Sequence, residues 1–257
     1  MASSDLDLAR ILHCSWVATV EWYDTIESTN DRAKQLAIRR AGPLPALIVA
    51  GRQTAGRGRG TRRWWTGRGA LAMSLLVDFS RWGLSRRRSP LVALASAVAM
   101  VEAVRPHLSG QMVGLHWPND VYVDQRKLAG VLVEVPTADR LVIGIGINTN
   151  NTLAEAPRAL RQTAVTLLDL TGRRHDHTSL VLELLAHLDS LLAATGRAPD
   201  EIGQRADALC LQRGRTLTID CGGRSVRGRC MGIARDGALM LQTPEGPQRF
   251  LTGTVIT

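Results

Sequence analysis

The entire net charge of this chain lies in one short segment, between Gly51 and Pro90. The segment holds ten arginines and one acid, Asp78, so it carries +9, which equals the formal net charge of all 257 residues. The rest of the chain balances, with 22 basic and 22 acidic residues. A chain that is basic throughout would indicate nucleic acid or an anionic surface as its partner, whereas one basic segment in a neutral chain indicates a local anion site.

The centre of this segment is a loop, residues 51–65, that is rich in glycine and arginine. Gly56, Gly58 and Gly60 alternate with other residues, so the backbone can approach a ligand closely and turn its amides toward an anion. The interleaved arginines offer a bidentate geometry that suits phosphate and carboxylate. A solvated surface loop or an RNA-binding Arg-Gly segment could have the same composition. However, exposing the indoles of Trp64 and Trp65 to water is unfavourable unless they cover a ligand.

This loop is neither of the common nucleotide-binding glycine motifs. A Trp pair and a strand follow it, rather than the helix that a dinucleotide-binding fingerprint requires. The chain has only two lysines, Lys34 and Lys127, and neither lies in a Walker A pattern. The other 30 basic residues are arginines, which indicates a codon bias, and the bias makes each remaining lysine informative because Arg cannot replace a compact point charge.

Hydrophobic periodicity predicts both helices and strands, which indicates an α+β fold. Capping residues before the first apolar stripe and Gly-Pro after it set the bounds of the first helix. The predicted helices span residues 30–40, 89–106, 159–170, 179–194 and 199–211, and the predicted strands span residues 47–50, 71–77, 112–116, 131–135 and 141–147.

The sequence pattern changes after residue 211. Short strands at 216–220, 225–233, 238–242 and 248–251 are separated by glycine turns, which predicts a small all-β module of about the size of an SH3-like barrel. We therefore expect two domains, residues 1–210 and residues 211–257.

Several classes of protein are not expected. The four cysteines form no CxxC pair, which suits a reduced cytoplasm rather than a zinc site or a disulfide framework. Residues 1–7 carry acids where a secretory signal would be basic. The longest uncharged apolar run, residues 91–101, has 11 residues against the roughly 20 of a membrane span. His175 and His177 are expected on a surface loop rather than at a metal.

Two further motifs accompany the glycine loop. His116-Trp-Pro-Asn-Asp places Asn119 and Asp120 in a turn, and Lys127 opens the next strand; taken alone, this is also the pattern of an ordinary hairpin. Gly144-Ile-Gly-Ile-Asn148 puts alternating glycines in a strand, which indicates that either a ligand or another strand packs against its backbone.

In order along the chain, these motifs resemble the biotin–protein ligase family. The motifs are Ser28-Thr-Asn, Gln53-Thr-Ala-Gly-Arg-Gly-Arg, Trp-Pro-Asn-Asp, Lys127-Leu-Ala-Gly and Gly-Ile-Gly-Ile-Asn. The resemblance runs over residues 24–171, and the β-module resembles the family's SH3-like C-terminal domain. It implies a class II synthetase-like catalytic domain, in which helices flank a mixed β-sheet. Only 27 residues precede Ser28, too few for the winged helix of longer members, so the chain resembles the ligase-only branch.

The resemblance implies a reaction and its partners. Biotin and ATP would form biotinyl-5′-AMP, and a lysine of a biotin carboxyl carrier domain would then take the biotinyl group. Mg²⁺ is expected with ATP, with no protein ligand assigned. The enzyme is expected in the cytoplasm as a monomer or homodimer, with no nucleic-acid or membrane partner.

The resemblance also assigns roles. The catalytic residues would be Lys127, Arg57, Arg59 and Asp120, the last as base for the acceptor lysine. The biotin site would comprise Ser28, Thr29, Asn30, Gln53, Gly56, Arg57, Gly58, Arg59 and Lys127. The nucleotide site would comprise Arg59, Arg62, Trp64, Asn119, Asp120, Lys127 and Asn148.

Two positions depart from the family's pattern, and two other functions compete. Thr61 stands where a glycine of the loop is usual. His116 stands where a permanent cation is usual; it would either gain a proton beside the triphosphate, or point away while a neighbouring Arg supplies the charge.

Lipoate–protein ligase shares the fold and the adenylation chemistry. A nucleic-acid-binding protein could use the Arg-Gly segment with Trp64 and Trp65, but it would leave the two other motifs unexplained.

Overall fold

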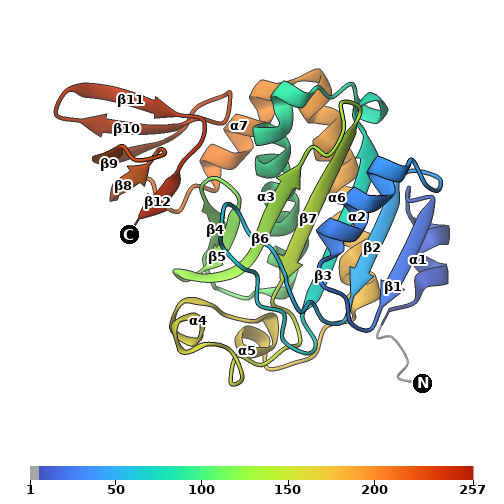
Figure 1. Cartoon of the computed structure of the whole chain (residues 1–257). Coiled ribbons are helices and arrows are strands. Elements are labelled where there is room, and N and C mark those ends of the chain that lie inside the picture. Colours follow the sequence, from blue (N-terminus) through green and yellow to red (C-terminus); the bar gives the residue numbers. More distant parts are fainter. Residues whose placement is uncertain (1–5, 257) are drawn as a thin grey trace.

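The computed structural model describes residues 6–256, so residues 1–5 of the N-terminal stretch considered above lie outside the described residues. Its larger part is a seven-stranded sheet in the order β1-β2-β3-β7-β6-β5-β4 (Figure 1). Only β1 and β2 pair in parallel, and the other neighbours are antiparallel. The strands are β1 (Thr19–Tyr23), β2 (Ala46–Ala50), β3 (Leu71–Asp78), β4 (Val113–His116), β5 (Asp120–Val123), β6 (Arg126–Glu134) and β7 (Arg140–Ile147).

Helices cover both faces of this sheet. One helix, α2, packs on β3 and β7 on the face that carries the pocket, while α3 packs on β6 from the opposite face and against α6 (Figure 1). The described helices are α1 (Leu8–Cys14), α2 (Thr29–Arg39), α3 (Ser89–Val104), α4 (Arg158–Thr163), α5 (Leu167–Thr171), α6 (His177–Arg197) and α7 (Pro199–Ala208), with short 3₁₀ turns at Phe79–Trp82, Arg86–Arg88 and Arg105–His107.

The smaller part is a five-stranded antiparallel sheet in the order β11-β10-β9-β8-β12. Its strands are β8 (Thr216–Asp220), β9 (Ser225–Ile233), β10 (Leu239–Thr243), β11 (Gly246–Phe250) and β12 (Thr254–Ile256). Along β9, exposed and buried residues alternate, so one face of this sheet packs inward and the other meets solvent. The predicted fold class, a mixed sheet with flanking helices and an SH3-like β-module, is confirmed.

The linker between the two parts, residues 209–215, lies along the free edge of β4. The N–H of Leu115 donates to the carbonyl of Leu209 at 2.7 Å, and the N–H of Leu211 donates to the carbonyl of Leu115 at 3.0 Å. An edge strand exposes unpaired backbone groups, and here the linker pairs with them. The C-terminal sheet is thereby joined directly to the hairpin of β4 and β5.

The structure differs from the sequence prediction in a few elements. The predicted helix 159–170 is two short helices, because Ala164–Thr166 leaves the helical path and the N–H of Val165 donates to the carbonyl of Lys127. Asp120 begins a strand, β5, instead of completing a turn. Helix α1 and strands β1, β5 and β12 were not predicted; they are short or lie at sheet edges, where periodicity is weak.

Two helical segments, 86–107 and 177–197, are long and apolar enough to cross a membrane by length and composition. These segments contain α3 and α6, which pack on each other in the structure. Twelve residues of α3 are buried, so its apolar character reflects its place in the core between the sheet and α6.

Candidate functional site

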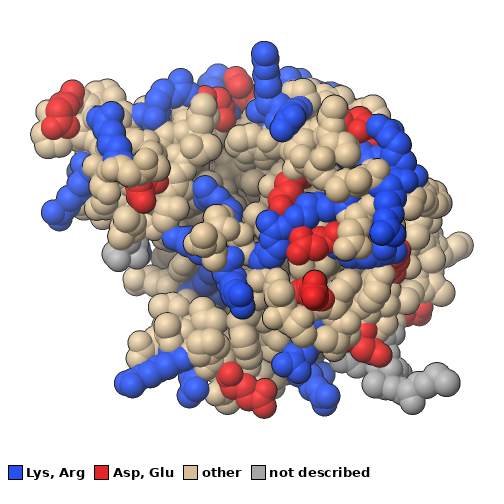
Figure 2. All heavy atoms as spheres, in the orientation of Figure 1, with Lys and Arg blue, Asp and Glu red and all other residues tan. Residues whose placement is uncertain are grey.

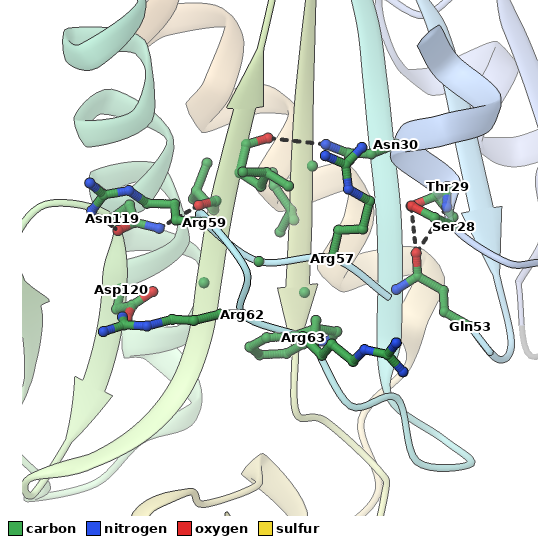
Figure 3. Close-up of a pocket in the computed structure, with 18 of the residues that line it drawn as sticks. Ser28, Thr29, Asn30, Gln53, Arg57, Arg59, Arg62, Arg63, Asn119 and Asp120 are labelled. Atoms are coloured by element: carbon green, nitrogen blue, oxygen red, sulfur yellow. Dashed lines mark hydrogen bonds between the residues drawn. The ribbon is translucent and has the colours of Figure 1, made fainter. Parts of the chain in front are cut away.

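A pocket of about 340 Å³ opens on the face of the sheet that carries α2. Lys and Arg side chains gather around a hollow in this face (Figure 2). The close-up shows the arginines of the glycine loop together with polar residues from the start of α2 and from the Asn119–Asp120 segment (Figure 3). The site residues predicted from the sequence line one pocket together, apart from Gly56 and Asn148. The pocket is lined by Ser28, Thr29, Asn30, Gln53, Arg57, Gly58, Arg59, Arg62, Arg63, Trp64, Met73, Asn119, Asp120, Lys127, Gly130, Val131, Leu132, Gly144, Ile145, Gly146 and Leu160.

The start of α2 supplies one polar end of the pocket. Ser28 caps the helix, so Thr29 and Asn30 occupy its first turn and are buried. Gln53 Oε1 accepts hydrogen bonds from the N–H of Thr29 at 2.9 Å and from its hydroxyl at 3.2 Å. Ser74 on β3 donates to Asn30 Oδ1 at 2.6 Å or to Thr29 Oγ1 at 2.7 Å. These bonds fix hydroxyl and amide groups at the pocket wall.

Two glycines of β7 make room for side chains of the site. A Cβ on Gly144 would overlap the amide of Asn30, and a Cβ on Gly146 would overlap the indole of Trp64. The prediction of close packing against this strand is confirmed, but the groups that pack there are the side chains of Asn30 and Trp64, not another strand.

The glycine loop folds back on itself as it passes over the pocket. The N–H of Trp64 donates to the carbonyl of Gly56, and the N–H of Gly58 donates to that of Arg62, each at 2.9 Å. A Cβ on Gly56 would overlap the carbonyl of Trp64, so only glycine allows this approach. Gly56 thus shapes the loop, although it is not among the residues that line the pocket.

Arg57 is held by carboxylates at the pocket rim. Its guanidinium lies 2.7 Å from Asp31 and 3.1 Å from Glu134. Lys34 bridges the same two acids at 2.7 and 3.1 Å. Glu134 also accepts a hydrogen bond from Asn30 at 2.9 Å. This cluster of Asp31, Lys34, Arg57 and Glu134, the rim cluster, ties the glycine loop to α2 and β6.

Arg59 connects the loop with both parts of the chain. Its Nη1 donates to Asn119 Oδ1 at 3.2 Å (Figure 3), and its Nη2 donates to the carbonyl of Gly253 at 3.0 Å. Burial lowers the pKa of Arg59 from its ordinary value, while the charge of Asp120 opposes the shift. The same loop therefore contacts the Trp-Pro-Asn-Asp motif and the C-terminal sheet.

Lys127 lies at the other end of the pocket with two of the predicted residues. Its ammonium is 2.6 Å from Asp120 Oδ2 and 5.6 Å from the centre of the Trp64 ring. Within the described residues, Trp64 Nε1 is buried without a hydrogen-bond partner. A second cavity, about 110 Å³, begins beside Trp64 and Lys127 and is lined by Asn148, so this predicted residue neighbours the site.

His116 does not point a charge into the pocket. Its ring stacks on Tyr122 with centroids 4.6 Å apart, and Gln212 Nε2 lies 3.3 Å from its Nε2. Burial lowers the pKa of His116, and the neighbouring Lys127, Arg215 and Arg62 lower it further, against the opposing effect of Asp120. This geometry fits the alternative in which neighbouring cations supply the positive charge.

The expectation that His175 and His177 lie on the surface is wrong. Only 7% of His175 and 5% of His177 is exposed. Asn150 holds the backbone of His175 on both sides, and the ring of His177 lies 2.8 Å from Thr149 Oγ1. Both histidines therefore support the segment that follows Asn148. In the part of the chain that the structure describes, no group of three His, Cys, Asp or Glu residues could hold a metal ion.

Sequence reasoning missed several polar residues of the site. Ser74 sits inside a buried strand, and Gln212 belongs to no motif. Asp31 and Glu134 stand beside motif residues, but the sequence assigned them no role in the site. Lys34 could have been found, because it is one of only two lysines, and both lie in ion pairs at this pocket.

Comparisons with known proteins agree with this geometry. Residues 22–148 match the Biotin/lipoate A/B protein ligase family, and residues 214–256 match the Biotin protein ligase C terminal domain. The biotin--[acetyl-CoA-carboxylase] ligase of Mycobacterium tuberculosis is 30% identical over 83% of this chain and 79% of its own, and that of Paracoccus denitrificans is 30% identical over 86% and 93%.

A solved structure shares the whole architecture. The biotin protein ligase from Aquifex aeolicus in complex with biotin and ATP superposes with a TM-score of 0.80 at 27% identity, covering 93% of this chain and 98% of that one. Together with the two relatives, this similarity extends across both sheets. The chain therefore belongs to the biotin–protein ligase family.

Proposed function

We propose that this chain activates biotin with ATP as biotinyl-5′-AMP and transfers the biotinyl group to a lysine of a biotin carboxyl carrier domain. The observation that carries this proposal is the pocket itself. The family's motif residues lie together there on the glycines of β7, beside Lys127 and the arginines of the loop. We further propose residues 1–210 as the catalytic unit and residues 211–257 as the SH3-like domain.

The first step brings two anions together, because the biotin carboxylate must attack the α-phosphorus of ATP and release pyrophosphate. Lys127, Arg59 and Arg62 line the pocket and would offset this repulsion and that of the developing charge. Arg57 already contacts two carboxylates, so we propose that it closes the loop over the bound acid more than it binds phosphate.

We assign the two ends of the pocket to the two substrates. Ser28, Thr29, Asn30 and Gln53 form a fixed array of donors and acceptors, which suits the ureido ring of biotin. Trp64, Asn119, Asp120 and Asn148 lie toward the other end, together with Lys127, and would bind the nucleotide.

The residues at the nucleotide end fit a magnesium ion that is held largely by phosphate. Asp120 is the one carboxylate among the residues that line the pocket, and Mg²⁺ commonly takes one or two carboxylates together with substrate phosphates. When bound, Mg²⁺ would neutralise phosphate charge. Asp120, now paired with Lys127, would become available as the Lys127 ammonium moves to the carboxylate of biotin.

In the second step the amine of the carrier lysine attacks the acyl carbon and AMP leaves. An amine with a pKa of about 10.4 is mostly protonated at neutral pH, so a base must take its proton. We propose Asp120 for this role because it lines the pocket beside Lys127. Closure of the glycine loop would keep water from the mixed anhydride.

The four cysteines are free thiols, which fits the reduced cytoplasm that we propose as the location. The carrier domain is the macromolecular partner that we propose, for an enzyme that acts as a monomer or homodimer without nucleic acid or membrane.

Mass spectrometry of a biotin carboxyl carrier domain incubated with the enzyme, ATP, Mg²⁺ and biotin tests the proposal. We expect one biotinyl group per carrier and none without ATP. Pyrophosphate release with biotin and with lipoate, measured side by side, tests the choice of acid. Release stimulated by lipoate alone, or no carrier adduct, would overturn the proposal.

A further inference from the structure

The linker between the two sheets contributes a buried side chain to the Trp-Pro-Asn-Asp motif. Gln212 is only 1% exposed, and its Oε1 accepts a hydrogen bond from the N–H of Trp117 at 2.7 Å. The two residues are 95 positions apart in the sequence. No motif of the chain includes Gln212, and a polar side chain buried this deeply is uncommon without a specific partner.

The bond fills a gap in the backbone pairing of β4. The linker pairs with this strand at Leu115, through Leu209 and Leu211, and the strand ends at His116. The N–H of Trp117 lies one step beyond that pairing and is buried, so it would lose a hydrogen bond to water without gaining another. The side chain of Gln212 continues the pairing by one residue.

The indole of Trp117 is fixed as well. It is 2% exposed, and its Nε1 donates to the carbonyl of Gly237 at 3.0 Å. The backbone of Trp117 is thus held by the linker and its ring by the C-terminal sheet. Both ends of this residue therefore depend on the C-terminal part of the chain.

Asn119 follows two residues later, and its position depends on this backbone. Its Nδ2 donates to the carbonyl of Val131 at 2.5 Å, and its Oδ1 accepts a hydrogen bond from Arg59. A shift at Trp117 would move Asn119 relative to these partners, and Asp120 with it. Thr29 and Gln53 lie on other elements and bond to each other, so they would keep their places.

We propose that Gln212 is a positioning residue for adenylation, which holds the Trp117–Asp120 turn in register with the nucleotide and leaves biotin binding unaffected. The inference rests on the proposed nucleotide role of Asn119 and Asp120. It assigns the linker a part in the first chemical step.

Three substitutions test this role. Gln212→Met keeps an unbranched side chain of similar length and removes the accepting oxygen. We expect about a tenfold to hundredfold loss of kcat/KM for ATP in biotin-dependent pyrophosphate release, since a buried N–H is left unpaired. Gln212→Glu keeps an oxygen for the N–H of Trp117 but replaces the amide beside His116 with a buried carboxylate, so it should restore only part of the loss. Gln204→Met, on the exposed side of α7, is the matched control and should behave as wild type.

Biotin affinity, measured by calorimetry without ATP, separates positioning from general damage. We expect the biotin Kd of Gln212→Met to stay within about twofold of wild type. Wild-type ATP kinetics for Gln212→Met, an equal loss of biotin affinity, or no recovery with Gln212→Glu would each overturn the inference. Asn119→Ala is measured in parallel: if it leaves the ATP kinetics unchanged, the proposed nucleotide site is wrong, whereas if it impairs them and Gln212→Met does not, only the positioning role fails.

Discussion

The indole of Trp64 rests on the bare backbone of Gly146, where any β-carbon would overlap the ring. Two residues earlier, Gly144 makes the same allowance for the amide of Asn30. Side chains on one face of a strand repeat every two residues, so these glycines place an aromatic ring and an amide side by side on one wall. The two contacts therefore allow the binding of ATP and the binding of biotin to be tested by separate substitutions.

We expect Gly146→Ala to displace Trp64 and to raise the KM for ATP by about tenfold, because roughly 1–2 kcal/mol of stacking and packing would be lost. Gly144→Ala should instead displace Asn30 and weaken biotin binding. Calorimetry with biotin and pyrophosphate-release kinetics with varied ATP distinguish the two. The same loss of both substrates in both variants would contradict this division of the pocket.

The two lysines of the chain provide a matched pair of substitutions. The ammonium of Lys127 lies 2.6 Å from Asp120, and a Cβ built on Gly130 would lie only 3.3 Å from the same nitrogen. A guanidinium is wider than an ammonium and cannot occupy the same point between the biotin carboxylate and the α-phosphate, so Lys127→Arg should reduce the rate of adenylation by at least about a hundredfold. Lys34 bridges Asp31 and Glu134 at the pocket rim. Because an arginine guanidinium can contact both carboxylates there, Lys34→Arg should keep most of the activity.

Single-turnover formation of biotinyl-AMP measures both variants. Near-normal adenylation by Lys127→Arg would mean that codon bias alone explains the scarcity of lysine elsewhere in the chain.

The rim cluster predicts how the glycine loop is released. Glu134→Gln removes the charge that Arg57 and Lys34 share and keeps an oxygen for Asn30. We expect the loop to open more often, so that trypsin cleaves between residues 57 and 63 several times faster and biotinyl-AMP escapes to label bystander proteins. Glu201→Gln, on the exposed side of α7, is the control. Equal cleavage and labelling in Glu134→Gln and the control would show that the rim cluster does not hold the loop.

Sequence patterns predicted the parts of the fold that periodicity governs. The strands β2, β3 and β7 are continuous apolar runs between clear turns, and the structure has them within about two residues. The edge strand β1 failed this test, since every residue is half-buried and the sequence shows neither alternation nor a full apolar run. The predicted helix 159–170 failed because Val165 pairs with Lys127, a tertiary contact that no local pattern records.

The same distinction holds for the site. Motif residues such as Asn30, Gln53 and Lys127 could be predicted, because each motif brings its neighbours along the chain with it. Gln212 and Glu134 could not, since their partners, Trp117 and Asn30, are about a hundred residues away. His175 and His177 were misplaced for the same reason: their burial depends on Asn150 and Thr149, from another part of the chain.

His116 should weaken the fold in acid. Burial lowers its pKa in the folded protein below the value of about 6.5 expected for an unfolded chain. Between the two values the unfolded chain binds more protons, so the free energy of unfolding rises with pH through this interval. The contribution of the neutral imidazole is therefore complete above about pH 6.5 and is lost as the pH falls through the folded-state pKa.

His116→Phe keeps a ring that can stack on Tyr122 and has no proton to gain. Urea unfolding of the variant between pH 5 and 7.5 should show a shallower loss of stability on the acid side than wild type, while His175, whose pKa is also lowered by burial, contributes equally to both proteins. The charged groups that face His116 are Asp120, Lys127, Arg62 and Arg215, and they are the same in both proteins, so the difference between the curves reports His116 itself. Because the imidazole is already neutral at pH 7, ATP affinity of the wild type should also be flat from pH 7 to 8. Parallel stability curves would mean that folding does not shift the titration of His116. An ATP affinity that falls steadily from pH 7 to 8 would mean that His116 carries a proton beside the nucleotide and acts as the missing cation of the family's motif.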